Sequence, residues 1–164
     1  MDLLMENRHF VKGLDPVADA FAGTVSSDVV SMREYGRVLF IVHIGVGATG
    51  TSTITVEACD DVTPTNQTAI AFWSREITTG DTEGAITRQA AAGFVTTAGS
   101  SKIVLVEVEA KDVGEASVNS IVGNEFVRLT AVESVNSPVL AGIMIEMGGE
   151  PSRYLADVKA TAIA

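Results

Sequence analysis

The feature that most constrains this sequence is the stretch from residue 37 to residue 59, in which two strand patterns flank a glycine-rich turn. The second half alternates threonine and glutamate with Ile54, Val56 and Ala58. Such alternation, with β-branched residues, is typical of a strand that has one buried and one solvated face. The first half, from Val38 to Ile44, is apolar or nearly so on both faces, which predicts a central strand covered twice. We expect the second cover to be the N-terminal arm or another subunit.

The turn between these two predicted strands, Gly45 to Gly50, matches the GxGxxG pattern of dinucleotide-binding proteins. In those proteins a helix follows at once, and its N-terminus binds the pyrophosphate. Here the following residues alternate as a strand, and no ribose-binding acid is correctly placed. We therefore interpret the turn as a hairpin loop, in which glycine supplies positive φ without steric cost. No nucleotide or other cofactor is expected.

The remaining strand patterns place the chain in the all-β class. They cover residues 28–32, 68–77, 93–97, 102–109, 125–134 and 139–147, with a single helical turn at 111–116. Parallel α/β folds are excluded because the sequence lacks crossover helices. About eight strands with turn signals at short intervals predict an antiparallel β-sandwich or jelly roll. At 164 residues, the chain suits one domain that needs no metal or disulfide for stability.

The predicted domain organisation has three parts. Residues 1–27 form an extended N-terminal arm, residues 28–149 form the β-sandwich, and residues 150–164 form a short apolar C-terminal tail. The first 13 residues have the pattern of a short helix, whereas residues 14–27 contain a proline, a glycine and no sustained period. An arm of this kind must lay its apolar side chains on another surface.

Charge and cysteine content exclude several classes of function. The formal net charge is −10, and no cluster of lysine and arginine is present, which argues against nucleic-acid binding. Cys59 is the single cysteine, and the neighbouring Asp60 and Asp61 would raise the pKa of its thiol, so we expect an inert, structural residue. The sequence shows neither a secretory signal nor a membrane-spanning segment, so we expect a soluble protein made in a cytoplasm.

No constellation of residues predicts catalysis or metal binding. His9 and His43 have no second ligand at metal-binding spacing, and we interpret them as packed core or interface residues. Asp60, Asp61 and Asn66 do not match the calcium-loop pattern and indicate a solvated turn, with a weak surface calcium site as the alternative. A hydrolase on this scaffold has the least support, because the sequence has no G-x-S-x-G element.

Trp73 and Arg75 support a different class of function. Placed on one face of a strand, an indole ring and a guanidinium group can stack against a sugar ring. This predicts, as an alternative, a carbohydrate-binding β-sandwich that serves host attachment. The competing interpretation is that the single tryptophan packs in the core or in an interface.

Several blocks of the sequence resemble a known family. The run from Val29 to Asp61, with T-T-G-D-T, F-V-R-L-T-A-V and S-P-V-L-A-G-I-M-I-E further on, is similar to small structural proteins encoded among the virion genes of tailed bacteriophages. The similarity extends from Val29 to Met147 and consists of strand and turn patterns. It implies a non-enzymatic, head-associated role, such as a capsid decoration or cement protein located in the virion after synthesis in the host bacterial cytoplasm.

The partner that this role implies is the major capsid protein or another virion protein, together with further copies of the chain. We expect a homo-oligomer, with a trimer favoured, because the resemblance is joined by more apolar surface than one copy can bury. The residues predicted to bind partners are apolar side chains of the arm and of a nominally wet strand face: Leu3, Leu4, Phe10, Val17, Phe21, Leu140 and Met144.

Overall fold

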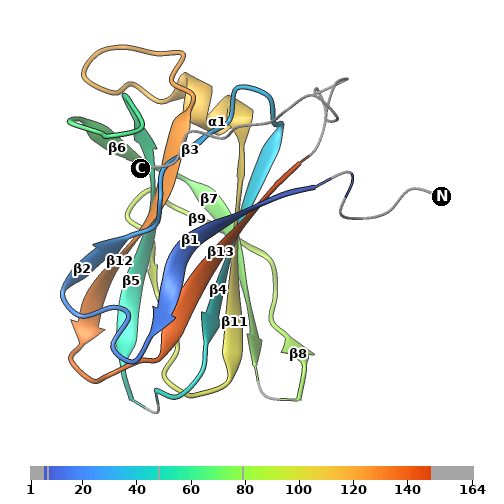
Figure 1. Ribbon diagram of the computed structural model, residues 1–164, viewed down its shortest axis with the longest axis vertical. Coiled ribbons are helices and arrows are strands. Elements are labelled where there is room, and N and C mark those ends of the chain that lie inside the picture. Colours follow the sequence, from blue (N-terminus) through green and yellow to red (C-terminus); the bar gives the residue numbers. More distant parts are fainter. Residues whose placement is uncertain (1–5, 7, 48, 79, 149–164) are drawn as a thin grey trace.

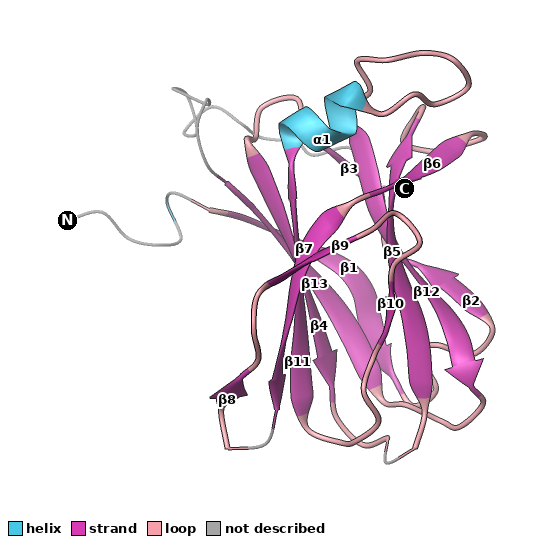
Figure 2. Ribbon diagram, turned by 180° about the vertical axis from the view of Figure 1, so that it is seen from behind, coloured by secondary structure: helices cyan, strands magenta, loops and turns pink. Residues whose placement is uncertain are grey.

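The computed structural model describes residue 6 and residues 8–47, 49–78 and 80–148 of the chain. These residues form two antiparallel sheets packed face to face, as Figures 1 and 2 show, and this confirms the predicted all-β sandwich. A short helix, α1 (Ala110–Glu115), lies at one end of the sandwich, close to the predicted helical turn. Within the described ranges, no helix is long and apolar enough to span a membrane.

The larger sheet has seven strands in the order β1-β13-β4-β11-β7-β8, with β9 also paired to β7. Their bounds are β1 (His9–Val17), β13 (Ala141–Gly148), β4 (Arg37–Ile44), β11 (Lys102–Glu109), β7 (Phe72–Thr78), β8 (Thr82–Glu83) and β9 (Thr87–Gln89). β4 and β11 pair in continuous register from Arg37 with Glu109 to Ile44 with Lys102. β4 is therefore central, as its sequence predicts.

The smaller sheet has six strands in the order β10-β5-β12-β2, with β6 paired to β5 and β3 paired to β12. Their bounds are β10 (Phe94–Val95), β5 (Thr51–Cys59), β12 (Phe126–Val135), β2 (Thr24–Ser26), β6 (Gln67–Ile70) and β3 (Val30–Ser31). The core lies between the two sheets, and its fully buried side chains come from the alternating inward positions of both: Val38, Phe40, Val42, Val104, Val106, Ile54, Val56 and Leu129.

The predicted hairpin between residues 37 and 59 is wrong. β4 belongs to the seven-stranded sheet and β5 to the six-stranded sheet, so the glycine-rich turn crosses from one layer to the other. None of its glycines has a positive φ. Instead they permit close packing, because a Cβ on Gly47 would lie 3.1 Å from a methyl carbon of Val139 and one on Gly50 would overlap the carbonyl oxygen of Ser137.

The N-terminal segment is extended, but it is not separate from the sandwich. Residues 9–17 form β1, an edge strand beside β13 (Figure 1). Residues 9–13 therefore belong to a strand and not to the short helix predicted over residues 1–13. Phe21 is 3% exposed, and the backbone N–H of Ala20 donates to Val139 O at 2.9 Å. The expectation that residues 14–27 lie outside the core is therefore wrong, because this segment supplies core side chains.

The strand predicted over residues 68–77 divides at Ala71. The part before this residue, β6, pairs with β5 in the six-stranded sheet, and the part after it, β7, pairs with β11 in the seven-stranded sheet. The chain thus passes from one sheet to the other within one continuous sequence alternation. The pattern does not reveal this change, because every second residue is buried in both sheets. The predicted C-terminal tail, residues 150–164, lies outside the described residues.

Candidate interaction surface

The outward surface of the seven-stranded sheet, here called the outer face, is unusually apolar. Outward positions on neighbouring strands are aligned by the register, so that Met144, Ile41 and Leu105 form one row and His43, Ile103 and Ile77 form the next. None of these side chains belongs to the buried core, and Met144 is 44% exposed. Four adjacent strands therefore present apolar side chains on the side of the sheet that faces away from the core, and Phe10 adds β1 as a fifth.

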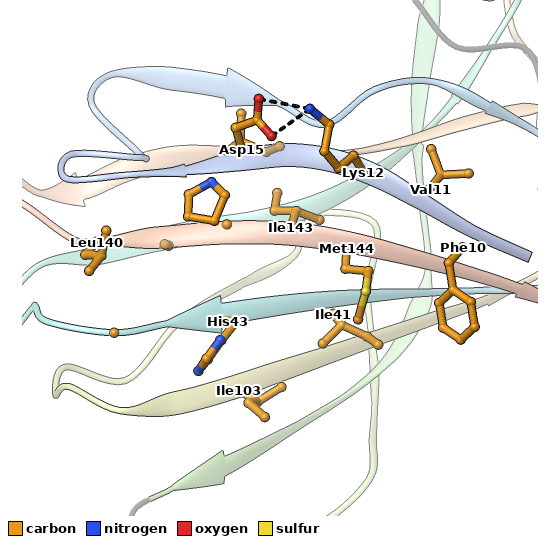
Figure 3. A pocket seen from close by; sticks show the side chains of 15 residues that line it. Phe10, Val11, Lys12, Asp15, Ile41, His43, Ile103, Leu140, Ile143 and Met144 are labelled. Atoms are coloured by element: carbon orange, nitrogen blue, oxygen red, sulfur yellow. Dashed lines mark hydrogen bonds and ion pairs between the residues drawn. The ribbon is translucent and has the colours of Figure 1, made fainter. Parts of the chain in front are cut away.

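The outer face contains a hollow of about 740 Å³, bounded on one side by β1 and on the other by β11. Phe10, Ile41, His43, Ile103, Leu140 and Met144 line it, and Figure 3 shows their side chains projecting from the same side of the sheet. Leu140 and Met144 protrude on either side of Gly142, and Pro16 of β1 fills the space beside this glycine, since a Cβ there would lie 2.8 Å from the proline Cγ. The volume and the apolar lining match those of sites that bind apolar groups.

The opposite surface of the molecule provides an internal comparison. The outward positions of β5, β12 and β2 carry hydroxyl and charged groups that bond to one another. Ser26 Oγ lies 2.9 Å from Thr130 Oγ1, and Thr130 donates to Glu57 Oε2 at 3.0 Å. Arg128 Nε donates to the same carboxylate oxygen at 2.8 Å. The two outer surfaces of the sandwich thus differ, since one carries this bonded polar network beside the exposed Val95 and Val132, and the other carries apolar rows and a hollow.

Ion pairs surround the apolar part of the outer face. Arg8 pairs with Glu146 at 3.4 Å, Lys12 with Asp15 at 2.8 Å, and Arg37 with both Glu107 and Glu109 at 3.1 Å. On the far side, Arg75 pairs with Glu83, and Arg88 pairs with Asp112 at 3.0 Å. Exposed pairs of this type contribute little to stability, because solvent screens them. Their main effect is to neutralise charge around the hollow, and the hydrogen bond from Lys12 to Asp15 raises the pKa of Lys12.

Three of the seven predicted partner-binding residues, Phe10, Leu140 and Met144, come together on this face. Val17 is exposed at the end of β1 but does not line the hollow, and Leu3 and Leu4 lie outside the described residues. The prediction for Phe21 is wrong, because its side chain packs in the core and is not available to a partner.

Sequence reasoning missed the contribution of β11 to this face. Ile103 and Leu105 point outward between Val104, Val106 and Val108, which point inward. The signal was present, because a strand whose odd and even positions are both apolar resembles β4 in this respect. The acidic outward residues at the end of the same strand gave it the appearance of ordinary alternation.

The other residues that the sequence singled out form no metal-binding group among the described residues. The ring of His9 stacks on Tyr35 at a centroid distance of 5.7 Å, whereas His43 is exposed at the hollow and is not a core residue. The described residues contain no cluster of three potential metal ligands.

Burial raises the pKa of the Cys59 thiol to about 11, which agrees with the prediction of an inert cysteine. Trp73 is 41% exposed on the outer face, and the Arg88 guanidinium carbon lies 5.4 Å from its ring centroid.

Comparison with known proteins adds little to this description. No family model matches the chain, and no curated protein matches it. Among solved structures, the infectious bursal disease virus Gx strain gives a TM-score of 0.20 at 14% identity, covering 95% of this chain and 43% of that one. The chain thus spans less than half the length of that neighbour, and a likeness this low carries no argument. The fold and the surface define the class: a β-sandwich whose seven-stranded sheet carries an apolar hollow on its outer surface.

Proposed function

We propose that this chain is a non-enzymatic structural protein of a tailed-bacteriophage virion, a capsid decoration, cement or other head-associated protein that self-associates and binds the shell. One observation carries the proposal: adjoining rows of apolar side chains line a hollow on the outer face that no described element of the chain fills. Exposed apolar patches of this extent mark sites of protein association. The resemblance of residues 29–147 to virion structural proteins supports the virion as the assembly in which this association takes place.

The architecture suits this role in physical terms. A decoration protein that self-associates must remain folded before assembly and must expose an apolar surface to further copies of itself. The closed core between the two sheets meets the first requirement, and the outer face meets the second. The partners we propose are the major capsid protein or another virion protein and further copies of this chain. The trimer expected from the resemblance stays a prediction.

Purified particles of the phage that encodes this chain provide the test. We expect mass spectrometry to find the protein in many copies per particle, and electron cryomicroscopy to place a β-sandwich on the head. In solution, light scattering coupled to size-exclusion chromatography should give a mass above that of one chain at micromolar concentration. A protein that is absent from purified particles and monomeric throughout this range would contradict the proposal.

A second candidate function is carbohydrate binding for host attachment, and the exposure of Trp73 is the observation that favours it. The indole ring and Arg88 form an exposed aromatic–guanidinium pair, whereas Arg75, which we expected beside it, is engaged with Glu83. Aromatic rings at the surface are common platforms for sugar rings. A glycan array distinguishes this function: binding that is lost in Trp73→Ala supports it, and an array without binding removes it.

A further inference from the structure

We infer that the outer face binds the same face of a second copy of this chain, so that two sandwiches pair back to back around a two-fold axis. The inference rests on the self-association in the proposed function and names its surface and its geometry. The competing occupants are the capsid shell and an apolar small molecule. Three features of the described residues favour the second copy: charge balance, shape and the state of the sheet edges.

Charge is the first feature. The chain carries a net charge of −10, so two copies repel each other over most of their surfaces. The outer face is the exception, because five of the 11 lysine and arginine residues surround it and each is paired with a carboxylate: Arg8, Lys12, Arg37, Arg75 and Arg88. A nearly neutral apolar patch on an acidic protein can approach an identical patch without electrostatic cost. A partner selected by opposite charge would call for an unbalanced, basic surface.

Shape is the second feature. Phe10 and Met144 protrude from neighbouring strands and are 43% and 44% exposed, and the hollow lined by Ile41 and Ile103 lies beside them (Figure 3). A two-fold interface requires that a surface be complementary to itself. A face that carries a protruding methionine beside a hollow meets this requirement, because Met144 of each copy can enter the hollow of the other.

Extent and edges complete the argument. Five strands at about 4.8 Å spacing and eight residues at about 3.3 Å give a face of roughly 600 Å² before side-chain relief is counted. Specific interfaces bury about 800 Å² per partner, so the face is of suitable size. The β1 edge is unsuited to strand pairing with another chain, because it carries Lys12, Pro16 and two register shifts. Association of the sheet through its face is therefore favoured over association through this edge.

The test compares two aspartate substitutions at sites of similar exposure. Met144→Asp places a charge in the proposed interface, and Val132→Asp places one on the outer surface of the six-stranded sheet, where Val132 is 40% exposed. We expect sedimentation equilibrium to give twice the chain mass for the wild type and for Val132→Asp. The dissociation constant of Met144→Asp should rise by on the order of 100-fold or more, because a buried, unpaired carboxylate strongly disfavours association. Circular dichroism should show both variants folded.

A cysteine cross-link supplies a second measurement that is independent of any loss of folding. A short bifunctional thiol reagent should join two copies of Met144→Cys, whereas it should not join two copies of Val132→Cys, and the native Cys59 is buried and does not compete. A trimeric mass, or association that Val132→Asp weakens and Met144→Asp does not, overturns the inference. These results would leave the virion role intact, because that role is tested separately by the presence of the protein in purified particles.

Discussion

Arg128 and Glu57 form a partly buried ion pair that joins β12 to β5, with Nε of the arginine 2.8 Å from a carboxylate oxygen and side-chain exposures of 19% and 17%. Arg128→Met should lower the free energy of unfolding by about 1–3 kcal/mol, because Glu57 then keeps a charge that only the Thr130 hydroxyl satisfies. Urea denaturation followed by circular dichroism measures this change.

Arg37→Met is the matched control for that prediction. Arg37 also bonds to two glutamates, but its side chain is 59% exposed, so its removal should change the free energy of unfolding by less than about 0.5 kcal/mol. Equal losses in the two variants would show that burial does not set the strength of these pairs. Adding Glu57→Gln to Arg128→Met should recover part of the loss, because the unpaired charge is then removed.

Position 93 requires glycine for two reasons, the backbone conformation there and the close approach of a neighbouring carbonyl oxygen. It has a φ of +77°, and a Cβ at this position would overlap the carbonyl oxygen of Ile54. Gly93→Ala should therefore lower the free energy of unfolding by more than the ~1–2 kcal/mol that left-handed backbone alone costs a residue with a Cβ. Gly23 has a φ of +70° with no atom near its would-be Cβ, so Gly23→Ala should show only that smaller loss. Denaturant midpoints of the two variants provide the comparison, and equal midpoints would contradict the steric argument.

The alternating strands illustrate what this sequence reveals locally. Val104, Val106 and Val108 were assigned correctly to an inward face because the period of two is a property of consecutive residues. The layer to which a strand belongs is not local, however, because β5 pairs with β12 from far along the chain and not with its neighbour β4. Short-range patterns therefore predicted the strands of residues 37–59 but not their separation into two sheets.

The N-terminal segment and the candidate surface show the same limit. β1 was not predicted because register shifts between Lys12 and Val17 break the alternation that identifies other strands. Phe21 lies in an irregular segment, where no period distinguishes a buried side chain from an exposed one. By contrast, Leu140 and Met144 were identified because they violate a regular pattern, being apolar at positions where alternation predicts polar residues.

The loop that follows β5 should respond to acid through Asp60. Hydrogen bonds from Asn66, together with those from Thr65, lower the pKa of Asp60 from its ordinary value of 3.8 to about 2. Because the pKa is lower in the folded state, the stabilisation is complete above pH 4 and is lost as the pH falls towards 2. We expect Asp60→Asn to unfold more easily than the wild type at pH 5 and about equally easily at pH 2, in thermal melts. An undiminished difference at pH 2 would contradict this assignment.

Trp73 offers a direct probe of whether the outer face becomes covered. Its indole lies in the outward row that also contains Glu107 and Leu39, so a second copy seated on this face would shield it. As the only tryptophan, it gives an unambiguous fluorescence signal. Acrylamide quenching should weaken as protein concentration rises through the dissociation constant, and should stay strong at all concentrations in Met144→Asp, while Val132→Asp behaves as the wild type. If the mass doubles and quenching does not change, the copies associate through a surface that leaves this tryptophan accessible, and the outer face must be assigned to another partner.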